Sequence, residues 1–409
     1  MESVRPKEAA VSIIGAGAAG LFAAAELVRA GRRVEIYDQR GEAALKLRLA
    51  GSSGLNIANA LPLAEFAQRY GDESRRFRSL LEDYPPDRVI EWAEALGART
   101  FRGSGGKILT KDGDGSTLIE GLLRFLRDSG LVSFRFGYRF SGFTPEGPIL
   151  TGQADSETVV AGLPALLALG GASWPLTGSN GLWAKAFREA GIRLAPFRPA
   201  NCGFETALGE GETGGRVPVK NLALAYAGKT VRGDIMLTPW GIEGAPVYAH
   251  ASALVRSLEG RSGGEGGADL IIDLYPDLEA KDILRRLSGD RGKASASTYL
   301  KKRLRLSPAR GILLRRALGG EAYKIIMDNP TLLKALPLPC RKPRPLEEAI
   351  SVSGGVEFGE LNEYFMLNKY PRVYCAGEML DWDAPTGGFL LTGCFVTAHR
   401  AVSRILETE

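Results

Sequence analysis

A glycine-rich turn near the start of the chain limits its possible folds more than any other feature. The segment Val11–Leu21 reads VSIIGAGAAGL, and its glycines follow the spacing G-x-G-x-x-G: Gly15, Gly17 and Gly20. An apolar strand precedes the turn, a helical stretch follows it, and a second apolar strand ends at Asp38. In a Rossmann unit the first glycine makes the turn, the second lets the backbone approach a pyrophosphate, and the third lets the helix pack closely on the strand. The sequence therefore predicts a Rossmann unit in its first forty residues.

This unit predicts a dinucleotide site. The N–H groups at the start of the helix attract a pyrophosphate, and an acid at the end of the second strand accepts hydrogen bonds from an adenosine ribose. We expect this half of the site to contain eight residues: Gly15, Ala16, Gly17, Ala18, Ala19, Gly20, Asp38 and Gln39.

A second glycine-acid pattern lies near the other end of the chain. The stretch Tyr374–Glu378 reads YCAGE, and an apolar run follows Gly387-Gly388. At a flavin site, a Gly-acid pair lies against the ribityl chain, and the next helix points its N–H groups at the flavin pyrimidine edge. Alone, Gly377-Glu378 is more typical of a β-turn with a solvated carboxylate. A nicotinamide dehydrogenase usually closes its dinucleotide domain in one stretch, so the wide spacing favours FAD.

A third glycine pair, Gly170-Gly171, ends a stretch predicted to be a buried strand. It lacks the third glycine of a dinucleotide fingerprint, so we expect its backbone to approach the FAD. The absence of a second fingerprint predicts that NAD(P)H, as a reductant, binds transiently over the flavin without a domain of its own.

The pattern between the two predicted halves of the site changes twice. Residues 204–273 alternate between apolar and polar, which favours strands, and residues 278–336 have helical periodicity. We expect an FAD domain made of residues 1–198 and 346–409, an inserted β-rich domain of 199–275 and an inserted basic helical domain of 276–345.

The composition is that of an ordinary soluble globular protein, with 44% hydrophobic and 24% charged residues. The sequence has no signal-peptide pattern, and glycines and prolines interrupt its longest uncharged stretch, residues 158–184, so we expect no membrane helix. The four cysteines lack C-x-x-C spacing and there are two histidines, which favours reduced thiols and no metal site. We therefore expect a cytoplasmic protein.

Four blocks together resemble one known family. They are residues 15–20, 45–56 (LKLRLAGSSGLN), 169–175 (LGGASWP) with 177–179, and 376–381 (AGEMLD) with 386–388. This combination is similar to the bacterial BaiN/YhiN-type, aminoacetone-oxidase-like FAD-binding flavoproteins, in a smaller branch of that family. The resemblance implies an α/β fold with tightly bound FAD. Its glutathione-reductase-like Rossmann FAD domain is discontinuous, with an inserted β-barrel-like unit and a basic helical unit.

The resemblance also places residues at the flavin by position. They are Lys46, Gly51, Ser52, Asn56, Gly377, Glu378, Asp381, Gly387, Gly388, Phe389 and Leu390. The chain departs from many relatives at Gly54-Leu55-Asn56, where they have Arg-Cys-Asn, and Leu55 is neither a nucleophile nor an acid. The candidate catalytic residues are Lys46 and Cys394; the alternatives are a solvated loop lysine and a buried structural thiol. His250, Tyr248 and Cys202 are further candidates for a general acid.

A strongly basic stretch lies between Arg291 and Arg344. It contains 14 lysines and arginines but two acids, Glu321 and Asp328, which gives a net charge of +12. A solvated helix face is the common explanation, but a charge this lopsided also predicts a polyanion partner. Aromatic residues are few here, which favours structured RNA over a single strand. The predicted polyanion face contains Lys301, Lys302, Arg303, Arg305, Arg310, Arg315 and Arg316.

These features leave several functions open. The sequence predicts an FAD-dependent oxidoreductase that transfers hydride through a tightly bound flavin, with NAD(P)H as the reductant. The resemblance implies two more specific possibilities, a small-molecule amine oxidase and a flavin-dependent enzyme that reduces uridines in ribosomal RNA. The basic stretch favours the RNA-modifying enzyme. A non-catalytic, redox-sensing flavoprotein is a further alternative.

Overall fold

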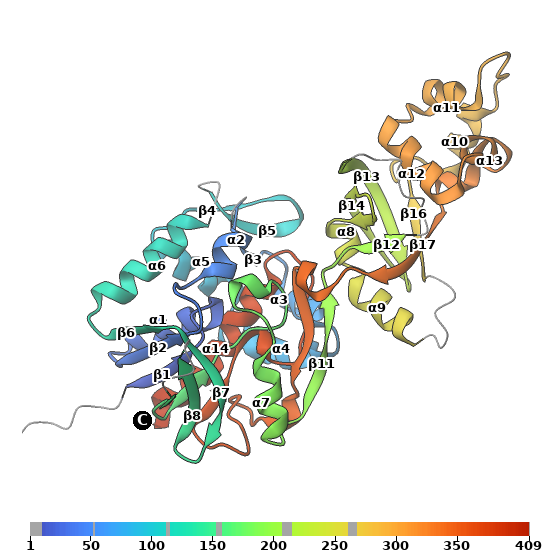
Figure 1. Cartoon of the computed structure of the whole chain (residues 1–409). Helices are drawn as coiled ribbons and strands as arrows, with labels where there is room; N and C mark the ends of the chain where they lie inside the picture. The colour runs from blue at the N-terminus through green and yellow to red at the C-terminus, as the bar shows by residue number, and fades with distance from the viewer. Residues whose placement is uncertain are drawn as a thin grey trace, which may run out of the picture. The chain divides into compact units, whose positions relative to one another are not determined.

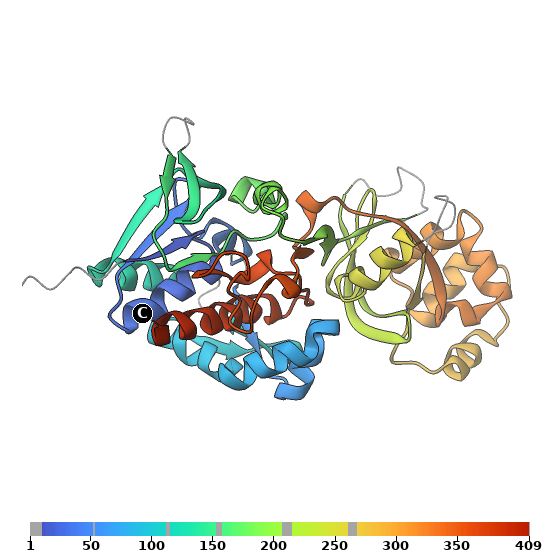
Figure 2. The same ribbon diagram turned by 90° about the horizontal axis from the view of Figure 1, so that it is seen from below.

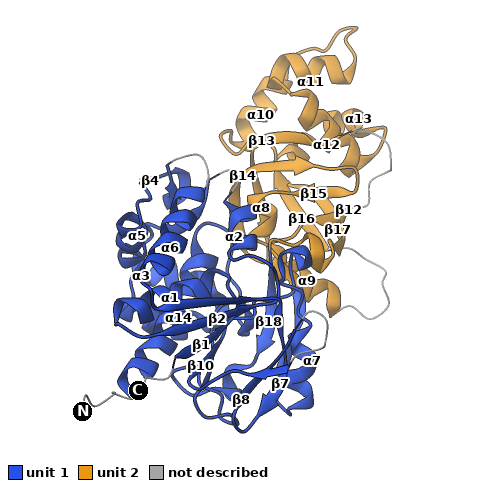
Figure 3. Cartoon of the chain, turned by 60° about the vertical axis from the view of Figure 1, so that its left-hand side comes forward, with its two compact units in different colours: residues 1–198, 351–409 blue, residues 199–350 orange. Residues whose placement is uncertain are grey.

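The protein folds into two compact units. The structure, a computed structural model, describes residues 10–51, 54–111, 115–152, 158–206, 215–260 and 268–408. Unit 1 consists of residues 1–198 and 351–409, and unit 2 of residues 199–350 (Figure 3).

A parallel five-stranded sheet forms the centre of unit 1. Its order is β19-β10-β1-β2-β6, so the strand nearest the C-terminus pairs with β10 at one edge. Every residue of β1 is buried, as expected for a parallel sheet that is covered on both faces. The strands are β1 (Val11–Ile14), β2 (Val34–Asp38), β6 (Val132–Phe136), β10 (Ala165–Leu167) and β19 (Val373–Cys375).

Two helices from opposite ends of the chain pack side by side in unit 1. They are α1 (Ala18–Arg29) and α14 (Phe389–Thr408), which are blue and dark red in Figures 1 and 2. Their contact includes the stacked rings of Phe22 and Phe395, whose centroids are 4.9 Å apart. The other helices of this unit are α2 (Leu45–Ala50), α3 (Leu63–Ala67), α4 (Ser74–Asp83), α5 (Pro86–Ala95), α6 (Ser116–Asp128) and α7 (Trp183–Glu189).

Smaller sheets complete unit 1. One has the order β3-β5-β4, another β7-β8-β9, and β11 pairs with β18. Their strands are β3 (Asn56–Asn59), β4 (Thr100–Arg102), β5 (Lys107–Thr110), β7 (Tyr138–Thr144), β8 (Gly147–Gly152), β9 (Thr158–Val160), β11 (Leu194–Ala200) and β18 (Ser351–Val356).

Unit 2 contains a closed antiparallel barrel with the order β12-β15-β14-β13-β16-β17. The barrel closes where β12 pairs with β17. Its strands are β12 (Phe204–Thr206), β13 (Val217–Tyr226), β14 (Lys229–Leu237), β15 (Gly241–Glu243), β16 (Ala268–Asp273) and β17 (Leu336–Pro343), and the helices α8 (Ala245–Tyr248) and α9 (Ala251–Glu259) lie beside it.

Four helices follow β16 and share one hydrophobic core with the barrel. They are α10 (Ala280–Leu287), α11 (Ala296–Leu304), α12 (Pro308–Leu318) and α13 (Ala322–Asp328). The predicted fold class is therefore confirmed: a discontinuous Rossmann-type domain with an inserted barrel and helical unit. No helix in the described ranges has the length and apolar character needed to cross a membrane.

Candidate cofactor site

The three fingerprint glycines face different surroundings. A Cβ added to Gly15 would lie 2.2 Å from the Ala168 carbonyl oxygen, and one added to Gly20 would lie 1.9 Å from the Gly15 oxygen. A Cβ added to Gly17 would meet nothing within 4 Å. Gly15 and Gly20 are therefore required by packing within the protein. Gly17 faces open space beside the start of α1, which no described side chain caps.

Asp38 supports the fingerprint turn from the end of β2. Its Oδ2 accepts the Ala16 N–H at 2.7 Å, and its Oδ1 accepts the Arg40 N–H at 2.8 Å. Burial raises the pKa of this carboxyl, although both N–H bonds oppose the change. A carboxylate has about four acceptor positions, so Asp38 can hold the turn and still accept hydrogen bonds from a ribose.

The loop after β10 is tied to the residues that follow Asp38. Gln39 Nε2 donates to the Gly178 oxygen, and Arg40 Nη2 donates to the Leu176 oxygen, both at 2.6 Å. In the same loop, the buried Ser179 Oγ has no hydrogen-bond partner among the described residues. It lies 3.2 Å from the position of a Cβ on Gly170. An unpaired buried hydroxyl is costly unless something satisfies it, and a bound ligand would do so.

Gly171 has a packing role of its own. A Cβ there would lie 2.4 Å from Val352 Cγ2. The side chain of Val352 therefore accounts for this glycine without a cofactor.

Lys46 joins three distant segments of unit 1. Its Nζ donates to Glu378 Oε2 at 2.6 Å and to Ser173 Oγ at 2.8 Å. Lys46 comes from α2, Ser173 from the loop after β10, and Glu378 from the turn Gly377–Met379 after β19. The ion pair is largely shielded, with the Lys46 and Glu378 side chains 27% and 15% exposed. The two residues are 332 positions apart in sequence, so folding alone brings these parts of the predicted site together.

Gly377 brings the C-terminal half of the site against α1. A Cβ on Gly377 would lie 2.9 Å from Ala19 Cβ. Its N–H donates to Thr397 Oγ1 at 3.0 Å, and its oxygen accepts the Trp382 Nε1–H at 2.9 Å. Trp382 is buried and packs beneath this turn.

The turn before α14 is held by strand β3. Asn59 Nδ2 donates to the Gly387 oxygen at 3.0 Å. With its amide oriented to satisfy both ends, the Asn56 side-chain oxygen accepts the Gly388 N–H at 3.2 Å. A Cβ on Gly388 would lie 2.1 Å from the Ala58 oxygen. Strand β3 thereby fixes where α14 begins, at the buried Phe389 and the half-buried Leu390.

Cys394 is buried one turn into α14. Burial raises the pKa of its thiol well above the ordinary value. It lies close to the site, 3.7 Å from the position of a Cβ on Gly377. This environment disfavours the thiolate that a nucleophile needs, and it fits the structural alternative better than catalysis. His250 has a structural environment too, since it is buried and its Nε2 lies 3.0 Å from the Leu224 oxygen.

The remaining predicted positions lie in different surroundings. Gly51 packs against Gly115, and the carbonyl oxygen of Gly51 accepts the Gly115 N–H at 2.9 Å. Asp381 is half-buried, and burial raises the pKa of its carboxyl. Ser52 lies outside the described residues.

The structure also brings in residues that the sequence did not single out for the site: Asn59, Ser173, Ser179 and Thr397. Two of them offered a signal, because Ser173 and Ser179 lie in the glycine-rich block after β10. The hydroxyl of Thr397 reaches Gly377 only because α14 packs beneath the turn. Taken together, the open space at Gly17, the uncapped helix and the unpaired Ser179 hydroxyl fit a bound dinucleotide. Within the described ranges, no group of three or more His, Cys, Asp and Glu residues could hold a metal ion.

In unit 2, the structure corrects part of the predicted polyanion face. Arg316 is only 5% exposed, and its Nη1 donates to the Gly241 oxygen at 3.1 Å. Its inclusion in an open face was wrong, because α12 turns this side chain toward β15. Arg315 is half-buried, and its Nη1 donates to the Tyr323 hydroxyl at 2.6 Å.

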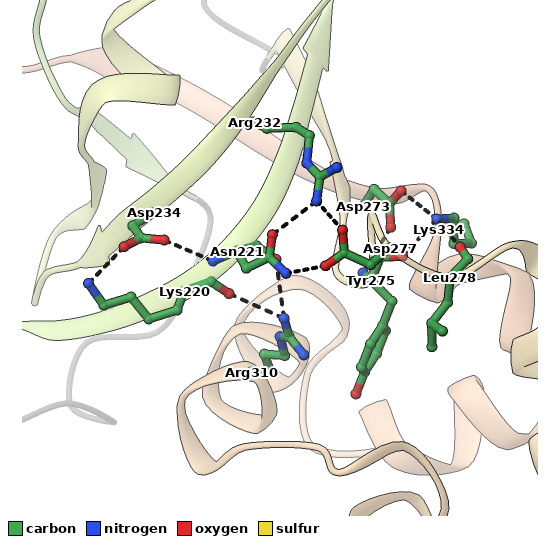
Figure 4. Close-up of polar contacts among 10 residues, drawn as sticks. All are labelled: Lys220, Asn221, Arg232, Asp234, Asp273, Tyr275, Asp277, Leu278, Arg310 and Lys334. Atoms are coloured by element: carbon green, nitrogen blue, oxygen red, sulfur yellow. Dashed lines mark hydrogen bonds and ion pairs between the residues drawn. The ribbon is translucent and has the colours of Figure 1, made fainter. Parts of the chain in front are cut away.

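Arg310 fastens α12 to strand β13 (Figure 4). Its Nη2 donates to the Lys220 and Asn221 oxygens at 3.2 and 3.1 Å. The guanidinium also lies over the Tyr275 ring, 4.6 Å from its centroid. These contacts indicate a role in stability, so Arg310 is a weak candidate for RNA contact.

Three acids near the barrel have cationic partners. Asp277 accepts hydrogen bonds from Arg232 at 2.5 Å and from Asn221 at 2.6 Å, and Lys220 pairs with Asp234 at 2.7 Å (Figure 4). Nearby, Lys334 pairs with Asp273 at 2.6 Å. In these three ion pairs, positive and negative charges offset one another.

Comparisons with known proteins agree with this architecture. The model of the HI0933-like protein Rossmann domain matches residues 9–404. The chain is also similar to the ribosomal RNA dihydrouridine synthase of Escherichia coli K12, at 24% identity over 392 residues that cover 92% of this chain and 93% of the relative. The resemblance predicted from the sequence is thereby confirmed.

Solved structures show the same fold at low identity. A flavocytochrome c3 fumarate reductase in its open conformation has 16% identity and a TM-score of 0.52, over 98% of this chain and 79% of its own. The 3-ketosteroid-Δ4-(5α)-dehydrogenase of Rhodococcus jostii RHA1 has 13% identity and a TM-score of 0.51, over 98% of this chain and 97% of its own. The family and the fold are those of FAD-dependent oxidoreductases.

Proposed function

Because the chain belongs to the HI0933-like family, we propose that this FAD-dependent oxidoreductase reduces uracil bases in structured ribosomal RNA, with NAD(P)H as the electron donor. The observation that carries the proposal is the end-to-end similarity to the E. coli ribosomal RNA dihydrouridine synthase. The basic helices of unit 2 support a polyanionic substrate. A cytoplasmic location, as predicted from the sequence, fits such a substrate.

The reaction saturates the C5–C6 double bond of the base, which gains a hydride at C6 and a proton at C5. When bound, FAD would relay to C6 the hydride that NAD(P)H gives up in becoming NAD(P)+, and the proton at C5 would come from solvent. The fingerprint turn and the start of α1 would hold its pyrophosphate, and Asp38 its adenosine ribose. Glu378 would face the ribityl chain, and Lys46 would hold the Glu378 carboxylate in place. The first turn of α14 would direct its N–H groups toward the flavin pyrimidine edge and would favour negative charge there.

The test is direct chemical analysis of the product. Purified yellow holoprotein would be incubated without oxygen with NADH or NADPH and unmodified ribosomal RNA transcript. Digested RNA would then be analysed by mass spectrometry for dihydrouridine. A matched control uses Gly17→Val, which should fold but lack flavin. We expect dihydrouridine with the wild-type holoprotein and a nicotinamide donor, and none with the control.

Other outcomes would favour the alternatives. Rapid reoxidation by oxygen with an amine substrate, and no dihydrouridine, would contradict the proposal and favour a small-molecule oxidase. A flavin that is neither reduced by NAD(P)H nor reoxidised would indicate a redox-sensing or structural flavoprotein.

A further inference from the structure

The helices α10 and α11 and the turn between them expose an unusual concentration of positive charge. Nine lysines and arginines are exposed here, and seven of them form no ion pair with a described residue. We call these seven the α10–α11 face: Arg286, Arg291, Lys293, Lys301, Lys302, Arg303 and Arg305. Three of the seven, Arg286, Arg291 and Lys293, lie outside the polyanion face predicted from the sequence.

Few acids oppose this charge. Between residues 280 and 306 the chain has two, Asp282 and Asp290. Asp282 already pairs with Arg285 at 2.8 Å, and Asp290 Oδ1 accepts the Gly292 N–H at 2.9 Å. On the barrel, by contrast, Asp234, Asp273 and Asp277 each have a cationic partner. The field of the α10–α11 face is therefore left uncompensated.

The face is also firmly supported. Ile283, Leu300 and Leu304 belong to the hydrophobic core of unit 2. Ser295 caps α11 by accepting the Thr298 N–H at 3.2 Å, and the Tyr299 hydroxyl donates to the Gly289 oxygen at 2.5 Å. The apolar sides of both helices thus face inward, and the cations extend from a fixed backbone. Among them, the Arg303 guanidinium lies over the Tyr299 ring, 5.4 Å from its centroid.

The chemistry of this face distinguishes between partners. A membrane-surface helix needs an exposed apolar side. The apolar sides of α10 and α11 are largely buried in the core of unit 2, although Leu284 is 46% exposed. A single-stranded nucleic acid would call for exposed aromatic rings, and Tyr299 is buried. Cations without stacking groups match a regular phosphate backbone, which releases counterions when it is neutralised.

We propose that the α10–α11 face binds the phosphate backbone of double-stranded or otherwise structured RNA. This inference rests on the proposed function and specifies which surface holds the substrate polymer. The cations there recognise phosphates by charge and spacing, so binding through this face does not depend on base sequence.

The experiment measures the affinity of the holoprotein for a fluorescent RNA hairpin by anisotropy over a range of salt concentrations. One variant combines Arg291→Glu, Lys293→Glu, Lys301→Glu and Lys302→Glu. Its matched control replaces four exposed arginines of unit 1 by glutamate and so has the same net charge. They are Arg69, Arg75, Arg124 and Arg127. Flavin absorbance and circular dichroism would confirm that both variants are folded.

The expected result is a loss of affinity of at least tenfold in the unit 2 variant, with little change in the control. The slope of log affinity against log salt should also fall, by roughly 0.9 for each duplex phosphate that the variant no longer neutralises. Equal losses in both variants, or none in the unit 2 variant, would overturn the inference. So would binding of anionic vesicles or an acidic protein in preference to RNA.

The proposed function has a separate readout. If wild type makes dihydrouridine but the unit 2 variant binds the hairpin normally, this inference fails and the function stands. If wild type binds RNA through this face yet makes no dihydrouridine, the proposed function fails alone.

Discussion

The two units use their polar and charged groups in opposite ways. In unit 1, the candidate site depends on single positions. A Cβ added to Gly20 would lie 1.9 Å from the Gly15 oxygen, and Lys46 Nζ donates to Glu378 Oε2 at 2.6 Å. On the α10–α11 face of unit 2, several exposed cations would together bind the RNA backbone, and none has an ion-pair partner in the described part of the chain. A site of the first kind should fail when one residue changes, whereas a surface of the second kind should weaken gradually.

The largest effect is expected at the fingerprint glycines. Gly20→Val should destabilise unit 1 by about 3 kcal/mol or more, because the new side chain overlaps the Gly15 carbonyl. Gly17→Val should leave the flavin-free protein as stable as flavin-free wild type, since nothing lies within 4 Å of its Cβ and its backbone is extended. It should nevertheless lose FAD. Thermal melts and flavin absorbance test both variants, and a yellow Gly17→Val protein would contradict the placement of the pyrophosphate.

The next effect concerns the ion pair that joins the two halves of the site. Removing one partner of a fully buried ion pair lowers the free energy of unfolding by about 3–5 kcal/mol. This pair is partly exposed, so we expect the removal of one partner to cost less, about 1–2 kcal/mol. We expect Lys46→Met and Glu378→Gln each to weaken FAD binding roughly tenfold, which corresponds to about 1.4 kcal/mol. The double variant should be little worse than either single variant. Additive losses, measured by titrating FAD into apoprotein, would show that Lys46 does not act through Glu378.

A smaller contrast is expected within unit 2, between Arg310→Ala and Lys302→Ala. Arg310 donates to two carbonyl oxygens and lies over Tyr275, so its removal should lower the free energy of unfolding by about 1–2 kcal/mol. It should leave the salt dependence of RNA binding unchanged. Lys302→Ala should keep the stability and lower the salt slope by roughly one. Urea unfolding and RNA titration on both proteins test this contrast. A loss of stability in Lys302→Ala, or a lower salt slope in Arg310→Ala, would contradict it.

The smallest effect is expected at an exposed ion pair of the barrel. The Lys220 ammonium, together with the Asn221 N–H, holds the pKa of Asp234 below its ordinary value. A carboxyl with a lowered folded-state pKa stabilises the protein above its unfolded-state pKa, and this contribution is lost as the pH falls through the folded-state pKa. Asp234→Asn should therefore cost only a few tenths of a kcal/mol near neutral pH. Urea unfolding should show the difference vanish in strong acid, and a constant difference would argue against this pair as its source.

The fold could be predicted from the sequence because its strongest signals are local. The glycine spacing and the strand before it require a particular turn whatever the rest of the chain does. Gly377, Gly387 and Gly388 are local signals too, because their positive φ values of 81, 128 and 95° suit residues without a Cβ. The alternation in residues 204–273 likewise predicted a β-rich insertion, which the structure shows as a closed barrel.

The sequence by itself therefore determined the Rossmann unit, the two halves of the candidate site and the excess of positive charge in the insertion, because each follows from residues close together in the chain. The tertiary structure decided which side chains meet and which cations remain exposed. Lys46 acquires Glu378 as a partner across 332 positions, and no local pattern records that contact. Arg316 follows Arg315 directly in α12, yet it is buried against the barrel while the cations of the α10–α11 face stay in water. The physical reason is that a long arginine side chain is buried or exposed according to which element packs against its helix, and only folding settles that.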